Sequence, residues 1–421
     1  MAVPRFVKRL LAAAVILSLI VLGGGLAYSL GNNPLLSFML MGTFIIHMSS
    51  SPGKAERAIT VGIAVLFRET YVVTKGFHIY FGSAIVSWGG FLGLASLVVL
   101  LVQIARSRGG IRQSRQTTLM TAGALPYAWI IVAFSLGTIT HTSRTLDANL
   151  MAFDVSLGTP FSFVLGRWLA VSPLLAGLTL LVYHALPLGG ASMLAWYNQS
   201  RFRPVKVIHL YLSVMILGFT VYWLYPAAGP MYAYAGAFPW NPPAKWAILA
   251  HAVAPFDAPR NAMPSLHFGA MLILMWNSRA WPRWGRLVAL CFTLAIAFST
   301  IALGEHYLID LVVAFPFILG MQAAWSAAVP LRTPCRWQAL AAGFGTTGLW
   351  FLALRWAIPL FLSSPVLAWT CVATTVLGSI WLEQRLAHAL WRDYRQEAPV
   401  PVRRKRALPG GVLAANFDIV K

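Results

Sequence analysis

Residues 286–328 read RLVALCFTLAIAFSTIALGEHYLIDLVVAFPFILGMQAAWSAA. Two apolar runs, at 286–303 and 307–328, flank a short polar turn that carries Glu305 and His306. Each run approaches the roughly 20 residues that a helix needs to cross a hydrocarbon core about 30 Å thick. The segment therefore predicts two membrane-spanning helices joined by a polar turn.

The composition of the whole chain agrees with this segment. Of 421 residues, 58% are hydrophobic and only 10% are charged, and the mean hydropathy is +0.71. A soluble globular chain carries roughly a quarter charged residues. We therefore predict an all-α, polytopic membrane bundle, and we exclude a soluble α/β enzyme, a collagen, a coiled coil and a disordered chain.

Apolar windows predict about twelve spans along the chain. Their approximate ranges are 10–30, 34–49, 58–74, 78–105, 118–140, 163–186, 206–225, 264–279, 286–303, 307–328, 338–359 and 364–385. The first follows a basic flank and has no small-residue cleavage site, so we interpret it as a retained span and not a signal peptide. Residues 383–395 have the pattern of an amphipathic cytoplasmic helix.

The net charge of +21 is concentrated in short clusters between the apolar runs. The clusters are Arg5, Lys8 and Arg9; Arg106, Arg108, Arg112 and Arg115; Arg201, Arg203 and Lys206; Arg279, Arg283 and Arg286; Arg332 and Arg336; and Arg403 to Arg406. Cytoplasmic loops retain Lys and Arg, so we expect an inner or plasma membrane protein with both termini in the cytoplasm and the long loops 141–162 and 226–263 outside. Attraction to anionic lipid headgroups explains the charge more simply than nucleic-acid binding does.

Two polar clusters lie at the ends of predicted spans, where polar groups are costly and therefore point to function. The first, RNAMPSLHFG at 260–269, leads into a helix whose first turn contains Pro264 and His267. The second, STIALGEHYLID at 299–310, places His306 and Asp310 four residues apart on one helix face. The predicted topology puts both histidines at the same depth on the outer side.

Two histidines and a carboxylate supply a nucleophile, an orienting acid and a general acid–base in one place. A neutral imidazole attacks through one ring nitrogen, and a carboxylate that accepts a hydrogen bond from the other nitrogen fixes the tautomer. A second histidine can protonate a leaving oxygen and later deprotonate an incoming hydroxyl. We expect the rings of His267 and His306 within about 8 Å, and a hydrogen bond of about 2.7–3.2 Å between His306 and Asp310.

These motifs resemble the type 2 phosphatidic acid phosphatase superfamily. Residues 264–267 match its second signature, Pro-Ser-x-His, and residues 299–310 match the third signature in the spacing of Ser, His and Asp. The resemblance spans roughly 118–328 and implies a six-helix core. It also implies that His306 is the nucleophile that forms a phosphohistidine, that Asp310 is its partner, that His267 protonates the leaving group, and that no metal or other cofactor takes part.

With this resemblance, the chain divides into four parts. They are an N-terminal extension of about four spans (1–117), the six-helix catalytic core (118–330), two C-terminal spans (331–390) and a basic cytoplasmic tail (391–421). The three cysteines, Cys291, Cys335 and Cys371, have neither paired nor CxxC spacing and so indicate no disulfide framework or metal site.

The sequence departs from the superfamily at its phosphate-binding cations. Thr300 stands where the third signature has Arg, and the first signature (Lys, six residues, Arg-Pro) is reduced to Arg203-Pro204, with Trp196 in place of Lys. The Gly-Glu-His-Tyr turn at 304–307 and the Tyr-Pro-x-x-Gly-Pro loop at 225–230 look like the inositol phosphorylceramide synthase branch, whose members move a phospho-headgroup from a lipid to an alcohol.

A phosphoryl transition state still needs positive charge. The cations expected to replace the missing ones are, in order, Arg260, Arg167, Lys245 and Arg144. Ser265, Glu305 and Tyr307 complete the expected substrate-binding set.

The sequence leaves three functions open. The favoured one is a metal-independent lipid phosphotransferase with its site on the extracytoplasmic side, which uses a lipid phosphate or phospholipid and an alcohol. The second is a polyprenyl-pyrophosphate or phosphatidate phosphatase, in which water is the acceptor. The third is a proton-coupled transporter or flippase in which the same residues relay protons. The oligomeric state is not predicted.

Overall fold

The computed structural model describes residues 34–75, 83–139, 145–200, 203–243, 258–326 and 328–397. Within these ranges the regular structure is entirely helical. The helices are α2 (Pro34–Ser49), α3 (Lys54–Lys75), α4 (Ser83–Arg106), α5 (Gly109–Ile139), α6 (Asp147–Ser156), α7 (Phe161–Val171), α8 (Pro173–His184), α9 (Leu186–Gln199), α10 (Val207–Leu224), α11 (Pro230–Ala233), α12 (Leu266–Trp276), η1 (Asn277–Ala280), α13 (Arg283–Ala302), α14 (Leu308–Trp325), α15 (Pro334–Trp356), α16 (Ile358–Ser363) and α17 (Pro365–Glu397).

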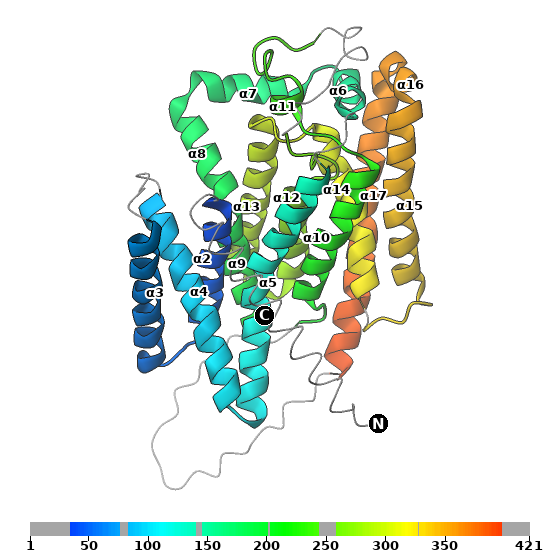
Figure 1. The fold of residues 1–421 in the computed structure, drawn as a ribbon. Helices are drawn as coiled ribbons and strands as arrows, with labels where there is room; N and C mark the ends of the chain where they lie inside the picture. The colour runs from blue at the N-terminus through cyan, green and yellow to red at the C-terminus, as the bar shows by residue number, and fades with distance from the viewer. Residues whose placement is uncertain are drawn as a thin grey trace.

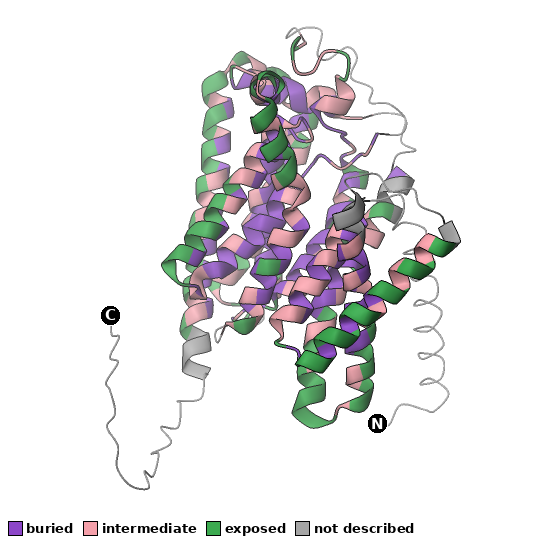
Figure 2. Ribbon diagram, turned by 90° about the vertical axis from the view of Figure 1, so that its left-hand side faces the viewer, coloured by how far each residue is buried: buried purple, intermediate pink, exposed green. Residues whose placement is uncertain are grey.

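The long helices run side by side as a bundle, and the short helices α6, α7 and α11 lie across its upper end (Figure 1). Buried side chains fill the interior while outward faces are exposed (Figure 2). Leu287, Val288 and Leu294 of α13 are apolar and more than half exposed. Such outward apolar side chains are expected of helices that contact lipid.

Five helices are long and apolar enough to cross a membrane, or up to seven if each bent helix pair is one span. The five are Trp88–Arg106, Val207–Leu224, Arg283–Ala302, Leu308–Trp325 and Pro365–Arg392. The structure thus agrees with a polytopic helical protein, but it does not confirm about twelve spans. The predicted span at 10–30 lies outside the described residues.

The predicted single span at 163–186 is wrong. Two helices, α7 and α8, occupy this stretch and are interrupted at Ser172. The Ser172 side chain accepts a hydrogen bond from the backbone N–H of Leu175, and Pro173 occupies the first turn of α8. A serine cap followed by proline starts a new helix, because proline has no backbone N–H to offer the preceding turn. A hydropathy window does not detect this break because both sides are apolar.

Two other predicted boundaries also change. The segment 141–162, predicted as a loop, contains the helix α6, which makes an angle of 89° with α7. The predicted amphipathic helix at 383–395 is not a separate element, because α17 runs without interruption from Pro365 to Glu397. The predicted domain boundaries at 117 and 390 fall inside α5 and α17, and the division into four parts stays a prediction.

α14 lies at the centre of the bundle. About 78% of its apolar window is buried, against 44% or less for the other four candidate spans. It packs against α10, α12, α15 and α17. The residues that precede α14 are therefore held by neighbours on several sides, which is the requirement for a rigid site.

A buried ion cluster holds α3 to the rest of the N-terminal helices. The carboxylate of Glu56 accepts two hydrogen bonds of 3.0 Å from Arg115 of α5 and lies 2.8 Å from Nε2 of His47 in α2. Arg115 is one of the basic residues that the sequence assigns to a cytoplasmic cluster. Its positive charge therefore pairs with the carboxylate of Glu56 inside the protein.

The loop between α10 and α11 packs against the polar turn before α14. The backbone N–H of Met231 donates to the carbonyl of Gly304 at 2.9 Å. Gly229 has φ of +96°, and a Cβ there would lie 2.3 Å from the carbonyl oxygen of Glu305. Glycine is therefore required both for the backbone conformation and for the close approach. This contact fixes the turn that carries His306.

Candidate active site

His306 is held by backbone hydrogen bonds in the turn before α14. The carbonyl of Thr300 accepts the N–H groups of both Glu305 and His306 at 3.1 Å. The His306 side chain is only 1% exposed, and its Nδ1 lies 2.8 Å from the carbonyl oxygen of Ala262. Since a carbonyl can only accept, Nδ1 carries the proton and Nε2 carries the lone pair.

The expected hydrogen bond between His306 and Asp310 is wrong. Oδ2 of Asp310 lies 3.4 Å from Nδ1 of His306, and it accepts the backbone N–H of Tyr307 at 2.8 Å. The Asp310 side chain therefore caps the start of α14 and lies beside the imidazole without a short hydrogen bond to it. The carbonyl of Ala262 takes the orienting role that the sequence assigned to Asp310.

His267 faces His306 from the first turn of α12. Nδ1 of His267 lies 3.4 Å from Nε2 of His306, and the ring centroids are 5.7 Å apart. Ser265 is the N-cap of α12, and its hydroxyl accepts the N–H of Phe268 at 3.3 Å. The two sequence motifs thus meet through ring nitrogens within the predicted 8 Å.

Tyr183 of α8 is a site residue that the sequence did not indicate. Its hydroxyl lies 3.4 Å from Nε2 of His267, and the two ring centroids are 5.0 Å apart. A tyrosine in an apolar helix resembles any interfacial aromatic residue, so spacing offers no signal for it. With Tyr183, both ring nitrogens of His267 have a polar neighbour.

Two buried aspartates of α6 were also missed. Asp154 accepts the backbone N–H groups of Leu308 and Ile309 at 2.9 and 3.3 Å. Asp147 accepts the N–H groups of Ala228 and Gly229 and the hydroxyl of Tyr307 at 2.9 Å. Carboxylates at a helix N-terminus satisfy its free N–H groups. The tilted helix α6 therefore holds both the start of α14 and the loop that covers it.

Burial controls the protonation of the two ionisable groups in the turn. Burial lowers the pKa of His306 to about 4, although its hydrogen bond to Ala262 works in the opposite direction. Burial raises the pKa of Glu305 to about 7, against the hydrogen bond that the Tyr232 hydroxyl donates at 3.3 Å. At neutral pH, His306 is a neutral imidazole, the form that has a nucleophilic lone pair.

The other predicted substrate-binding residues lie in different surroundings. Arg260 lies two residues before Ala262 and is 1% exposed. It donates to the carbonyl of Ala258 at 2.9 Å. Arg167 is exposed on α7. Ser265 and Tyr307 are fully buried; the Ser265 hydroxyl accepts the cap hydrogen bond of α12, and the Tyr307 hydroxyl donates to Asp147. Lys245 and Arg144 lie outside the described residues.

The remnant of the first signature lies far from the histidines. Trp196 stacks on Trp281 at 4.8 Å near the end of α9, and Arg203 precedes α10. α10 rises about 27 Å from this point to the loop that covers His306. Arg203 therefore cannot bind a phosphate at the histidine pair.

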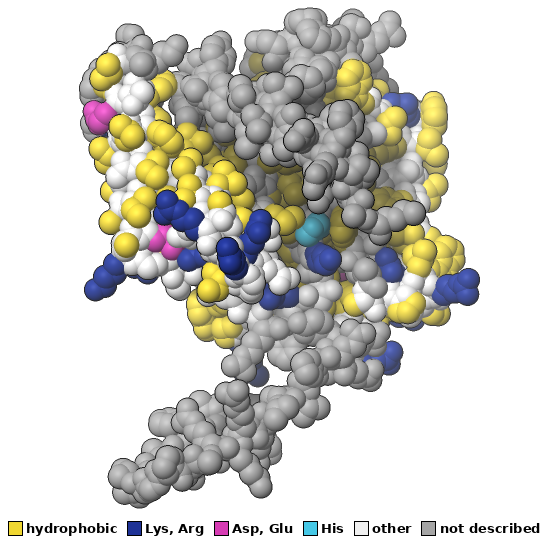
Figure 3. Space-filling view, turned by 60° about the horizontal axis from the view of Figure 1, so that its bottom comes forward, with side chains coloured by type: hydrophobic (Ala, Val, Ile, Leu, Met, Phe, Trp, Pro, Cys, Tyr) yellow, Lys and Arg dark blue, Asp and Glu magenta, His cyan; other side chains and the backbone are white. Residues whose placement is uncertain are grey.

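The basic clusters that fall within the described residues gather at the end of the bundle opposite the histidines. α12 begins beside His267 and α14 begins two residues after His306, so the starts of α10, α13 and α15, with their arginines, lie at the other end. Figure 3 shows Lys and Arg side chains gathered at this lower end. Among the residues placed by the structure, no group of three or more His, Cys, Asp or Glu is arranged to hold a metal ion.

Comparison with known proteins agrees with this geometry. A family model described as the PAP2 superfamily matches residues 148–324, from α6 to α14. The match includes both histidines, Asp310 and Tyr183, and it supports the superfamily for this segment. Members of the superfamily are phosphatases or phosphotransferases, which supports an enzyme. No curated protein and no solved structure matches the chain.

Proposed function

We propose that this protein is a lipid phosphotransferase that works through a phosphohistidine on His306. Nε2 of His306 attacks phosphorus, a P–N bond forms, and the P–O bond to the leaving group breaks. His267, protonated on both ring nitrogens in the reacting complex, gives its Nδ1 proton to the leaving oxygen and becomes a neutral imidazole. In the second half, His267 takes the proton of an alcohol whose oxygen attacks phosphorus, and the P–N bond breaks.

The observation that carries this proposal is the chain of hydrogen bonds through both rings. His306 Nδ1 faces the Ala262 carbonyl, so its Nε2 accepts from His267 Nδ1, and His267 Nε2 is left to accept from the Tyr183 hydroxyl. This order gives the nucleophilic lone pair to His306 and turns the Nδ1–H of His267 toward it. Uptake of a proton on Nε2, with the Tyr183 hydroxyl as its acceptor, makes His267 the imidazolium acid. It is the assignment that the superfamily resemblance implies.

The substrate must move the rings apart. Two nitrogens 3.4 Å apart are in direct hydrogen-bond contact, and no phosphorus fits between them. Active-site hydrogen bonds often change when substrate binds. His267, the more exposed ring of the pair, is the one expected to swing.

The sequence of the turn that carries His306 favours transfer to an alcohol over hydrolysis. The Gly-Glu-His-Tyr turn and the loop that packs on it resemble the inositol phosphorylceramide synthase branch. Glu305, next to the nucleophile, has a pKa of about 7 and can accept a hydrogen bond from an acceptor hydroxyl. The phosphatase alternative uses the same residues with water in place of the alcohol.

A transporter is less favoured because of where the polar groups lie. His267 and Asp310 lie in the first turns of α12 and α14, and His306 lies in the turn just before α14, whereas transporters place such groups halfway across the membrane. The separation of the histidines from the basic clusters supports a site on the extracytoplasmic side.

Mass spectrometry of membrane lipids tests the proposal. Membranes that contain the wild-type protein, the His306→Ala variant and no protein are compared. We expect a lipid with a new phospho-headgroup only with the wild type; loss of a lipid phosphate without such a product would indicate the phosphatase. Identical lipid changes with wild type and His306→Ala would contradict both enzymes.

A further inference from the structure

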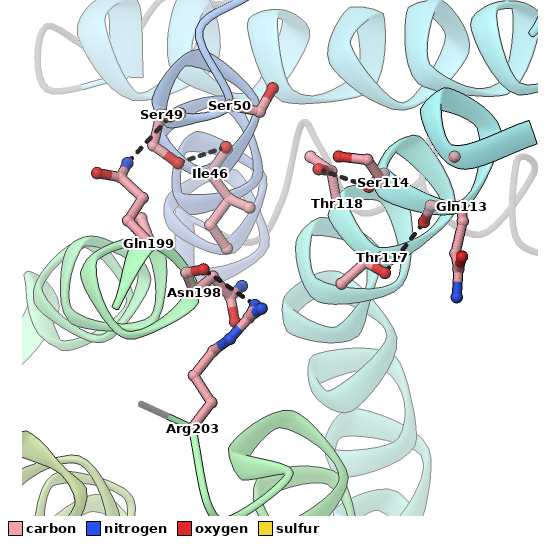
Figure 4. Close-up of a pocket in the computed structure, with 12 residues that line it drawn as sticks. Ile46, Ser49, Ser50, Gln113, Ser114, Thr117, Thr118, Asn198, Gln199 and Arg203 are labelled. Carbon is pink, nitrogen blue, oxygen red and sulfur yellow. Dashed lines mark hydrogen bonds between the residues drawn. The ribbon is translucent and has the colours of Figure 1, made fainter. Parts of the chain in front are cut away.

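A polar cavity of about 420 Å³ lies at the end of the bundle away from the histidines. It is bounded by the last turns of α2 and α9, the first turns of α5, and Arg203 (Figure 4). Two of these helices, α2 and α5, begin before the segment that matches the superfamily, and α9 lies within it. The cavity therefore exists only because the extension packs on the core.

The lining combines neutral hydrogen-bonding groups with one positive charge. Serine and threonine hydroxyls and the amides of Asn198 and Gln199 line the cavity together with Arg203. Figure 4 shows the residues of α2 and α9 with Arg203 on one side, opposite those of α5. None of the lining residues is acidic. This set suits a ligand rich in hydroxyls that carries one negative charge.

The local hydrogen bonds decide which groups remain for a ligand. The hydroxyls of Thr117 and Thr118 donate to the carbonyls of Gln113 and Ser114 in their own helix. Their oxygens therefore remain as acceptors for ligand hydroxyl groups. Arg203 donates from one amino group to the carbonyl of Asn198 at 3.0 Å. This bond holds the guanidinium at the cavity, with further N–H groups available to a phosphate.

The size and position of the cavity fit a small headgroup. Ligand sites have volumes of about 300–1,000 Å³. The cavity lies at the basic end of the bundle, about 27 Å (the length of α10) from the loop over His306. It is therefore separate from the proposed reaction site and does not depend on that proposal.

We propose that this cavity binds a polyol that carries one phosphate ester, with Arg203 on the phosphate and the α5 hydroxyls on the polyol. The same chemistry is found in the headgroup of an anionic phospholipid and in a free polyol phosphate.

The test measures binding to the full-length protein purified in detergent. Phosphatidylglycerol and phosphatidylcholine are compared by native mass spectrometry, and sn-glycerol 3-phosphate by thermophoresis. Binding of phosphatidylglycerol alone identifies a lipid headgroup, and binding of glycerol 3-phosphate identifies a soluble ligand. Both results support the site. If neither probe binds, or if phosphatidylcholine binds as tightly as phosphatidylglycerol, the proposal is wrong.

Three variants separate this cavity from general surface charge. Arg203→Gln should weaken binding at least tenfold, while Arg112→Gln, which removes an exposed charge of α5 outside the lining, should change it less than twofold. Gly110→Phe should weaken binding by placing a bulky ring at the cavity wall, because Gly110 is one of the lining residues and a Cβ there meets no atom that would disturb the fold. Thermal unfolding checks that each variant is folded.

Equal losses of binding affinity in Arg203→Gln and Arg112→Gln, or undiminished binding in Gly110→Phe, would overturn the assignment. His306→Ala should bind the probe as the wild type does. Loss of binding in that variant would show that the ligand occupies the reaction site instead.

Discussion

Nε2 of His306 lies 3.4 Å from Nδ1 of His267, although 38 residues separate the two in the chain. The contact exists because α12 and α14 begin at the same end of the bundle and pack against each other. Backbone groups then set the direction of each ring: the Ala262 carbonyl turns His306, and the Ser265 cap fixes the turn that holds His267. The predictions below follow from this geometry.

Replacement of Asp310 should slow the reaction more than it destabilises the fold. In Asp310→Asn the side chain can still accept the N–H of Tyr307, but an amide replaces the carboxyl group 3.4 Å from His306. We expect kcat to fall about a hundredfold, or ~2.7 kcal/mol of transition-state stabilisation. Steady-state kinetics with a lipid phosphate as substrate measures this change in kcat.

Asp154→Asn is the matched control, because Asp154 is equally buried and also caps α14 but has no contact with His306. Both variants should lose about 0.5–2 kcal/mol of stability as cap substitutions. An equal loss of kcat in the two would show that Asp310 acts only through the fold.

Tyr183→Phe should reduce turnover without changing substrate affinity. The variant keeps the ring beside His267 and removes the hydroxyl 3.4 Å from its Nε2. Loss of one hydrogen bond of about 1.4 kcal/mol corresponds to a tenfold lower kcat. Tyr197→Phe removes a hydroxyl bonded to the Val205 carbonyl at the other end of the bundle and should leave kcat unchanged. A changed KM with unchanged kcat in Tyr183→Phe would assign the hydroxyl to substrate binding.

The pH dependence should reflect the lowered pKa of His306. Burial lowers this pKa to about 4, and a protonated imidazole has no lone pair for attack. Above about pH 5 the rate should therefore not depend on the protonation of His306, and it should fall as the pH drops through about 4. Glu305→Gln should keep this acid limb and remove any inflection near pH 7, where Glu305 titrates. An acid limb centred near 6.5 in Glu305→Gln would contradict the assignment of His306.

Arg260 is the first choice for the phosphate-binding cation. Arg260→Ala should lower turnover by one to three orders of magnitude, roughly 1.4 to 4 kcal/mol, and Arg260→Lys should recover only part because an ammonium cannot hold two phosphate oxygens. Since Arg260 is buried, thermal unfolding must show that the variant is folded. If Arg260→Ala kept full activity while Arg167→Ala was folded but inactive, the phosphate-binding cation would be Arg167 of α7.

The sequence predicted helix positions well where apolar runs end in polar or glycine residues. α10, α13 and α14 begin and end within three residues of the predicted spans. It failed between residues 141 and 186, where the chain changes direction inside apolar sequence. The Ser172-Pro173 pair is the signal that would have revealed the break, because it combines a helix cap with a first-turn proline.

The site was predictable in its histidines and not in its supports. Pro-Ser-x-His and the His306–Asp310 spacing identify two local motifs. The number of predicted spans between them then places both motifs at the same end of the bundle. The Ala262 carbonyl could not be found, because every residue has a carbonyl and only the fold selects one. Asp147 and Asp154 act across more than 80 residues of sequence, so no local spacing indicates them.

Trapping of the phosphoenzyme tests the central claim most directly. The protein is incubated with a lipid labelled with ³²P in its phosphate, quenched in alkali and mapped by mass spectrometry. We predict one alkali-stable, acid-labile phosphate on His306, absent from His306→Ala and retained in His267→Ala with a substrate that has a good leaving group. Phosphate on another residue, or full activity in His306→Ala, would contradict the account.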